Sequence, residues 1–114
     1  MPAHGPYTCG LDAALDIVGG KWKSLILWAL SDRSPLRFGE LRREVVGITE
    51  KMLIQQLRQL EADGLVHREV YREVPPRVEY SVTEFGRTLT KALAPLGDWG
   101  ERHMERIANR HETI

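Results

Sequence analysis

The sequence contains little cysteine and no long apolar stretch, and both shortages exclude classes of protein. Cys9 is the single cysteine among the 114 residues. One cysteine excludes an internal disulfide and a zinc site built from several cysteines, although two chains could be joined through it. No apolar run approaches the roughly 20 residues that cross a bilayer, so we expect no membrane association. Residues 1–10 lack the basic start and apolar core of a secretory signal, which predicts a cytoplasmic location.

Net charge is also lacking, which is not typical of a protein that binds nucleic acid. The formal net charge is zero, yet the segment from Lys21 to Arg58 contains eight basic and four acidic residues, a local charge of +4. A locally basic surface can attract phosphate even when the whole molecule is neutral. A mixed-charge face is usually just solvated surface, so charge alone is a weak sign of DNA binding.

The length predicts one domain, and apolar spacing predicts a mainly α fold with one small β-hairpin. Apolar residues at steps of three and four indicate helices over residues 11–18, 21–30, 38–45, 50–62 and 84–109. Strand-favouring residues indicate two strands, 65–71 and 78–83. The paired Pro75-Pro76 between them marks a hairpin tip, because proline has no amide hydrogen for a sheet ladder. Pro95 and Gly97 are expected to bend or interrupt the last helix.

Residues 38–62 have the spacing of a helix-turn-helix. A short helix is followed by the turn Val46-Gly47-Ile48 and by a second helix from Glu50. Thr49 suits the N-cap of that helix, because its hydroxyl can accept a hydrogen bond from a first-turn amide. A hairpin with arginines at its tip follows, and a long amphipathic helix comes last. Each part is common alone, and their order predicts a winged helix-turn-helix.

The second helix of this motif has one apolar and one polar side. Leu53, Leu57 and Leu60 recur at helical spacing and are expected to face the core. The residues on the opposite side are Lys51, Gln55, Arg58 and Gln59. Arginine and lysine suit guanine, glutamine suits adenine, and an α-helix fits the major groove. We therefore expect these side chains to contact bases, the alternative being a polar face that is merely solvated.

Other side chains around this helix are expected to hold the DNA backbone. They are Thr49, Arg42, Arg43, Arg72 and Arg77. The last two lie at the hairpin tip, which predicts a wing that follows the backbone or enters the minor groove. The alternative is a charged loop that prevents edge-to-edge pairing of strands.

The last helix exposes more apolar surface than so short a chain can cover. Its apolar face consists of Leu89, Leu93, Leu96, Trp99 and Ile107. Packing against the same helix of a second chain would bury this face and place two recognition helices about one DNA turn apart, or a multiple of it. The alternative is that the helix completes its own core. Within a single domain, 1–114, we expect an N-terminal arm and helix (1–20), a helix-turn-helix (38–62), a wing (65–83) and a dimerisation helix (84–110).

Several stretches, taken in order, resemble the HxlR-type transcriptional regulators of the winged-helix class. They are Cys9 with Leu11, then Asp16–Trp22, Arg37–Leu41, Gly47–Leu53, Leu57–Val66, Val74–Tyr80 and Thr83–Gly86. The resemblance implies a winged helix-turn-helix, a homodimer built from the N-terminal and C-terminal helices, and regulation of nearby genes through double-stranded operator DNA. It specifies neither the operator nor the sign of regulation.

The same resemblance implies a role for Cys9. In this family the cysteine just before the first helix often senses oxidants or electrophiles such as quinones, aldehydes and hypochlorite. A helix N-terminus lowers the pKa of a thiol, and His4 or Lys21 could assist. Modification of Cys9, or a disulfide to the second chain, would change the angle between the recognition helices and weaken operator binding. The alternative is a small buried apolar residue.

Enzyme patterns are lacking as well. The histidines are scattered, the serines lack a paired base, and no glycine-rich phosphate loop occurs. We therefore expect no catalytic activity, cofactor or metal site. Two alternatives remain open: a winged-helix protein-interaction module that does not bind DNA, and a regulator that binds a small ligand at the dimer seam, where Trp22, Trp28 or Trp99 could line a pocket.

Overall fold

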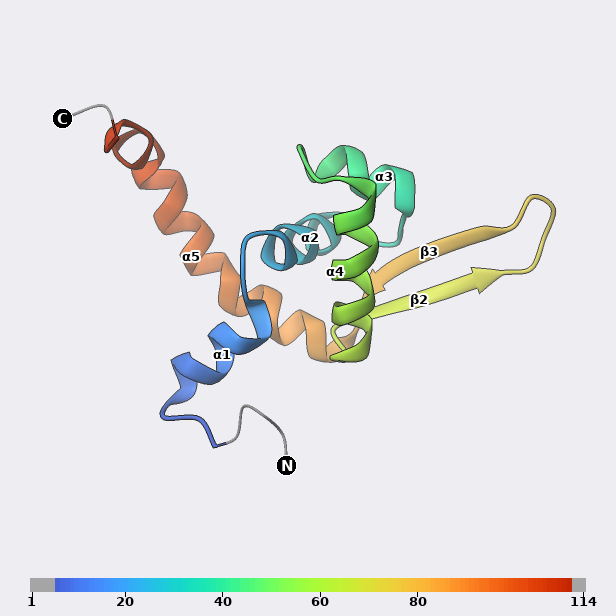
Figure 1. Cartoon of the computed structure of the whole chain (residues 1–114), viewed down its shortest axis with the longest axis horizontal. Helices are drawn as coiled ribbons and strands as arrows, with labels where there is room; N and C mark the ends of the chain where they lie inside the picture. The colour runs from blue at the N-terminus through green and yellow to red at the C-terminus, as the bar shows by residue number, and fades with distance from the viewer. Residues whose placement is uncertain (1–5, 112–114) are drawn as a thin grey trace.

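The computed structural model describes residues 6–111, which form five helices and three strands. In chain order these are α1 (Gly10–Val18), α2 (Trp22–Asp32), β1 (Leu36–Arg37), α3 (Phe38–Glu44), α4 (Glu50–Ala62), β2 (Val66–Tyr71), β3 (Arg77–Val82) and α5 (Glu84–Asn109). The expected mainly α fold with a small β-hairpin is confirmed, and each expected helix is present within a few residues of its expected bounds (Figure 1).

The sheet has three strands, not the two that the sequence predicts. Their order is β1-β3-β2, and both pairings are antiparallel. The additional strand, β1, has two residues and pairs Leu36 with Tyr80. Two residues are too few to show the alternation that marks a strand in sequence. The Leu36 side chain is only 2% exposed, so this short strand joins the sheet to the core.

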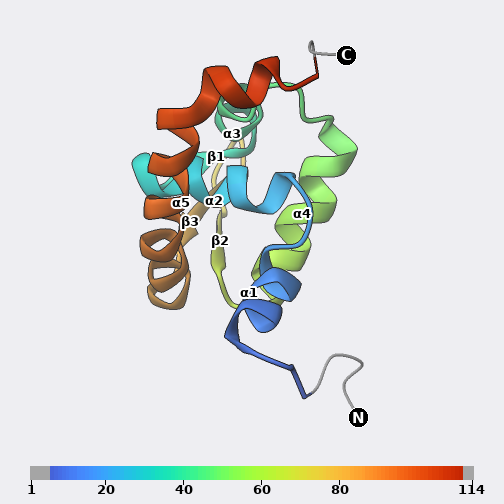
Figure 2. The ribbon, with the colours of Figure 1, turned by 90° about the vertical axis from the view of Figure 1, so that its left-hand side faces the viewer.

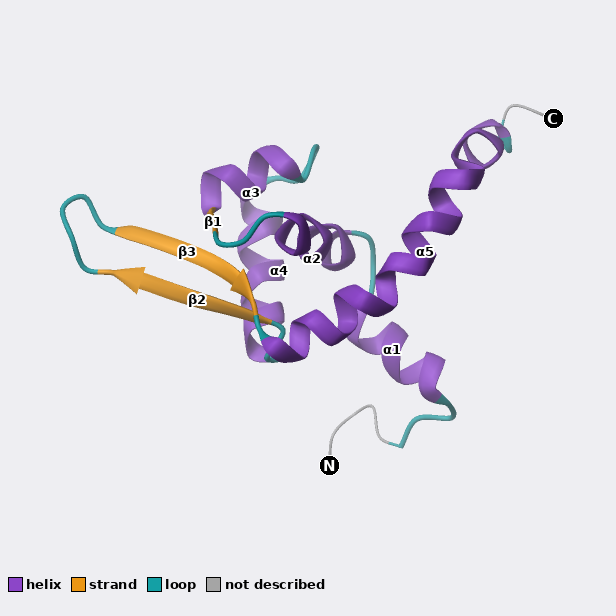
Figure 3. Ribbon diagram, turned by 180° about the vertical axis from the view of Figure 1, so that it is seen from behind, coloured by secondary structure: helices purple, strands orange, loops and turns teal. Residues whose placement is uncertain are grey.

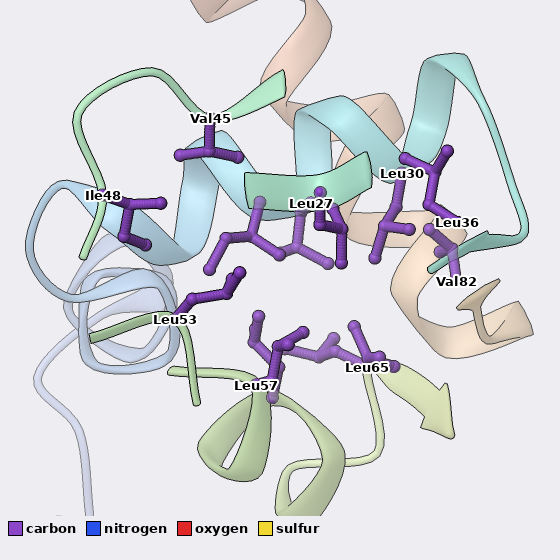
Figure 4. Packing of buried hydrophobic residues seen from close by; sticks show 13 residues of the cluster. Leu27, Leu30, Leu36, Val45, Ile48, Leu53, Leu57, Leu65 and Val82 are labelled. Atoms are coloured by element: carbon purple, nitrogen blue, oxygen red, sulfur yellow. The ribbon is translucent and has the colours of Figure 1, made fainter. Parts of the chain in front are cut away.

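Buried aliphatic side chains hold α2, α3 and α4 against the base of the sheet. Leu27 of α2 lies in the centre near Leu53 and Leu57 of α4, whereas Leu30 lies toward Leu36 and Val82 (Figure 4). Leu53, Leu57 and Leu60 are each at most 2% exposed, which confirms the predicted apolar side of α4. The orientation of α4 is therefore fixed by leucines at helical spacing.

Two threonines begin the helices that matter most for function. The Thr49 hydroxyl accepts a hydrogen bond from the Met52 amide at 3.1 Å at the start of α4, as the sequence predicts. The Thr83 hydroxyl accepts one from the Gly86 amide at 2.9 Å and donates one to the Gly64 carbonyl at 2.6 Å. Thr83 therefore ties the start of α5 to the loop that follows α4.

The wing and α5 extend from opposite sides of the helical body (Figure 3). The first half of α5 packs on the core through Leu89 and Leu93. Helix α5 is continuous from Glu84 to Asn109 with Pro95 inside it, so Pro95 and Gly97 do not interrupt the helix. The ribbon of α5 changes direction along its length (Figures 1 and 2). The short helix α1 contains no buried residue and lies to one side of the body.

Candidate nucleic-acid interface

The outer side of α4 is polar and open to solvent. The exposed side chains on it include Lys51, Gln55, Arg58 and Gln59. All four lie opposite the buried leucine stripe, so the structure brings together the set that the sequence predicts for base contact. The N-terminal end of α4 follows directly from the turn after α3, and its first-turn amides add a partial positive charge there.

Two arginines of α3 lie near the beginning of α4. Both Arg42 and Arg43 are exposed. The Arg42 Nη1 atom lies 3.8 Å from Glu50 Oε2, so this pair links the two helices of the motif at the surface. Within residues 6–111, Arg43 forms no ion pair. Arg43 is therefore the arginine of this pair whose charge is available to a phosphate.

The two wing arginines differ in their surroundings. Arg72 is exposed at the hairpin tip. The Arg77 side chain is only 29% exposed, and its Nε atom lies 3.4 Å from a Glu73 carboxylate oxygen and 3.7 Å from one of Glu79. Its guanidinium also stacks over the Tyr71 ring at 4.0 Å. Arg77 thus holds the two strands together at the wing tip, and its charge is already offset by two carboxylates.

A cleft between α4 and the sheet contains residues that the sequence analysis missed. Its lining includes Glu50, Ile54, Arg58, Arg68 and Tyr80. Arg68 pairs with Tyr80 across the ladder and lies on the same face of β2 as Val66 and Val70. Strand alternation places Arg68 on that face, so it could have been identified from its spacing to these valines. The cleft adds Arg68 to Arg42, Arg43 and Arg58 as a fourth arginine of the basic surface around α4.

The apolar face predicted for dimerisation is divided in the structure. Leu89 and Leu93 pack against the chain's own core, which is the alternative that the sequence left open for this helix. Leu96 is 64% exposed and Trp99 is 51% exposed, whereas Ile107 is half-buried. Within residues 6–111, the second half of α5 is therefore the part of the helix whose apolar surface is mostly left exposed.

Exposed apolar side chains also occur on α2, which lies next to this part of α5, and on α1. A groove between α2 and α5 is lined by Leu25, Trp28, Leu96 and Met104, among others. On α1, Leu11 is 67% exposed. Exposed apolar side chains such as those of the α2–α5 groove are typical of an interaction site in a small protein.

Cys9 occupies the N-cap of α1, and its side chain is exposed. Hydrogen bonds from the backbone amides of Asp12 and Leu11 lower the pKa of the thiol below its ordinary value. Cys9 is therefore not buried within its own chain. Lys21 lies over the Trp22 ring at 4.7 Å, and His4 lies outside the residues that the structure describes.

The segment before Cys9 is held against α1 by its own side chains. The Thr8 amide and hydroxyl both donate to the Asp12 carboxylate, each at 3.1 Å. The Tyr7 hydroxyl donates to Asp16 at 2.7 Å. These bonds fix the backbone on the N-terminal side of the thiol while leaving the sulfur open to solvent.

Residues 6–111 contain neither a metal-binding cluster nor a membrane-spanning helix. No group of three or more histidine, cysteine or carboxylate side chains there is placed to hold a metal ion. No helix in the same range is both long and apolar enough to cross a membrane.

Comparison with known proteins gives matches along most of the chain. A family model described as HxlR-like helix-turn-helix matches residues 17–108. YdeP, an uncharacterized HTH-type transcriptional regulator of Bacillus subtilis strain 168, is 52% identical over 99 residues, which cover 87% of this chain and 77% of that protein. The redox regulator HypR in its reduced form has a TM-score of 0.81 at 48% identity, covering 89% of this chain and 99% of that one. HypR in its oxidized form has a TM-score of 0.77 at 52% identity, covering 82% and 96%.

Proposed function

Because the chain belongs to the HxlR-like helix-turn-helix family and is a transcriptional regulator of the winged type, we propose that it binds operator DNA as a homodimer with α4 in the major groove. The relatives in this family are regulators and not enzymes. The observation that carries the proposal is the open polar side of α4, opposite the buried Leu53, Leu57 and Leu60.

Base recognition would come from the exposed side of α4. Lys51 and Arg58 can donate to guanine, and Gln55 and Gln59 can bond adenine through both its donor and its acceptor. The residues proposed to hold the backbone are Thr49, Arg42, Arg43, Arg72 and Arg77. Among these, Arg43 and Arg72 have the most available charge, whereas Arg77 supports the wing that carries Arg72.

A homodimer would cover the apolar surface of the second half of α5. Leu96 and Trp99 of two copies, together with the exposed Leu11 of α1, supply the apolar area that such an interface needs. A two-fold axis through this region would place both copies of α4 on one side of the dimer, about one helical turn of DNA or a multiple of it apart.

Cys9 would make this binding responsive to oxidants or electrophiles. A thiolate is the reactive form of cysteine, and the amides of α1 favour it. A similar protein, HypR, is described as a redox regulator and is known in reduced and oxidized forms. In this chain an electrophile would form a bond to the Cys9 sulfur, or two Cys9 thiols from the two protomers would lose two electrons and two protons to an oxidant as a disulfide forms. Either change next to α1 would alter the dimer and the spacing of the α4 helices.

Salt dependence tests the DNA-binding part of the proposal. Binding of the full chain to a duplex library should weaken steeply as salt rises, because each phosphate contact releases counterions. The same protein should be retained on heparin. A winged-helix protein-interaction module predicts no heparin retention and no duplex binding at low salt, and that result would overturn the proposal.

A second candidate signal is a small ligand at the dimer seam. The observation that favours it is the groove between α2 and α5, which contains the half-exposed Trp28. Quenching of tryptophan fluorescence by candidate aromatic compounds, lost in Trp28→Leu, would support this signal over Cys9 chemistry. Operator release by an oxidant that depends only on Cys9 would exclude it.

A further inference from the structure

One apolar side chain interrupts the polar outer side of α4. Ile54 is 36% exposed. It follows Glu50 by four residues and precedes Arg58 by four, so the three side chains form one stripe along the helix. A branched aliphatic residue on a solvated helix face contributes neither to solubility nor to helix propensity, so its position needs another reason.

Packing within the chain covers Ile54 only in part, because 36% of the residue stays exposed. The neighbouring Leu53 and Leu57 are at most 2% exposed and belong to the core cluster. Among residues 6–111, Ile54 belongs neither to that cluster nor to the half-buried side chains that pack against it. It lines two open hollows, one shared with Arg68 and Tyr80 of the sheet and one shared with Lys51 and Gln55 of α4.

The charges around Ile54 indicate which partner would cover it. Three basic residues, Lys51, Arg58 and Arg68, line the two hollows, against two acids, Glu50 and Glu61. The excess of positive charge around Ile54 favours a polyanion. The one acid of the stripe, Glu50, is paired with Arg42 at 3.8 Å. A recognition helix places the side chains of its N-terminal half against base edges, and Ile54 lies in the second turn of α4.

A base edge in the major groove offers one apolar group, the 5-methyl of thymine. Four residues advance about 6 Å along a helix, and base pairs are about 3.4 Å apart, so Ile54 and Arg58 would address positions about two steps apart. We propose that Ile54 contacts the methyl group of one thymine in each half-site and thereby selects thymine at that position. This inference rests on the proposed function of α4 and adds a specificity determinant to it.

The test uses a base that differs from thymine by that methyl group alone. An operator is first selected from a random duplex library with the full-length wild-type protein. Each thymine of one half-site is then replaced by deoxyuridine in turn, and binding is measured by fluorescence anisotropy at constant salt. At one position the wild-type protein should bind about fourfold more weakly, the value for one buried methyl-sized group, while thymines outside both half-sites give the baseline.

Ile54→Ala should bind the thymine and deoxyuridine operators equally well at that position. Ile54→Val, which keeps a branched side chain, should retain part of the difference. Thermal unfolding followed by circular dichroism establishes that both variants are folded. If Ile54→Ala still distinguishes thymine from deoxyuridine there, or if no position responds in the wild-type protein, the inference is wrong while the proposed function stands. If the library yields no preferred sequence, both are overturned.

Discussion

Replacing Arg58 tests base recognition separately from the general attraction of the protein to DNA. The Arg58 side chain is exposed on α4, and it forms no ion pair within the part of the chain that the structure describes. Replacing it by alanine should therefore change the free energy of unfolding by no more than about 0.5 kcal/mol. Any loss of binding in Arg58→Ala then reports a lost contact to DNA.

The magnitude follows from the chemistry of the contact. A bidentate arginine–guanine pair contributes about 1–3 kcal/mol of discrimination, which is about 5- to 150-fold in affinity for one half-site. Non-operator DNA of the same length should lose much less, because it offers no matching guanine. Arg43 provides the matched control: an exposed arginine on α3 that is proposed to contact phosphate.

Arg43→Ala should weaken binding to operator and non-operator duplexes by the same factor. It should also reduce the slope of the logarithm of the binding constant against the logarithm of the salt concentration by about 1 per protomer. Arg58→Ala should instead reduce the ratio of the two affinities. Both quantities come from anisotropy titrations at several salt concentrations. An equal loss on both duplexes in Arg58→Ala would make Arg58 a phosphate contact and would refute its assignment to a base.

Three other outcomes can be measured independently. Cys9→Ser should keep its operator affinity and should no longer release DNA on oxidant treatment; a serine variant that still releases DNA would contradict the sensor. Because the pKa of the wild-type thiol is lowered, its alkylation by iodoacetamide should reach half its maximal rate at a lower pH in the folded chain than in urea. Leu96→Glu should raise the dimer dissociation constant at least tenfold in sedimentation equilibrium, whereas Val74→Glu at the 99% exposed wing tip should leave it unchanged. Thr83→Val removes two hydrogen bonds and should cost about 2 kcal/mol in urea unfolding, while Thr88→Val, whose hydroxyl bonds only within α5, should cost less than about 0.5 kcal/mol.

The helices could be predicted because they depend on features close together in the sequence, namely the spacing of apolar residues and the capping residues. Leucine spacing fixed the buried side of α4, and the Thr49 cap fixed its start. The strand β1 could not be predicted, since it exists only through its pairing with β3. Its residue Leu36 has no periodic partner along the sequence, and burial against distant side chains decides its conformation.

Side-chain partners were the harder part of the site to predict. Charge alone suggested two equivalent arginines at the wing tip, but strand register places Arg77 between two carboxylates and over Tyr71, and leaves Arg72 exposed. A helical pattern likewise gave one apolar face on α5, whereas tertiary packing assigns Leu89 to the core and leaves Leu96 outside it. Both distinctions depend on which other elements lie nearby, and a single sequence does not contain that information locally.

The two hydrogen bonds of the Thr83 hydroxyl affect how α4 and α5 can move relative to each other. Strand β3 ends at Val82 and α5 begins at Glu84, so Thr83 alone connects them. Its hydroxyl is bonded to Gly64, in the loop that follows α4, so no flexible linker separates α5 from the helix-turn-helix. In the proposed dimer, α4 and α5 of each protomer would therefore move together. A small change in the angle between the two α5 helices would displace each α4 by an amount that grows with its distance from the dimer interface. A chemical change near that interface could thus alter the separation of the two α4 helices until it no longer matches the spacing of the two half-sites.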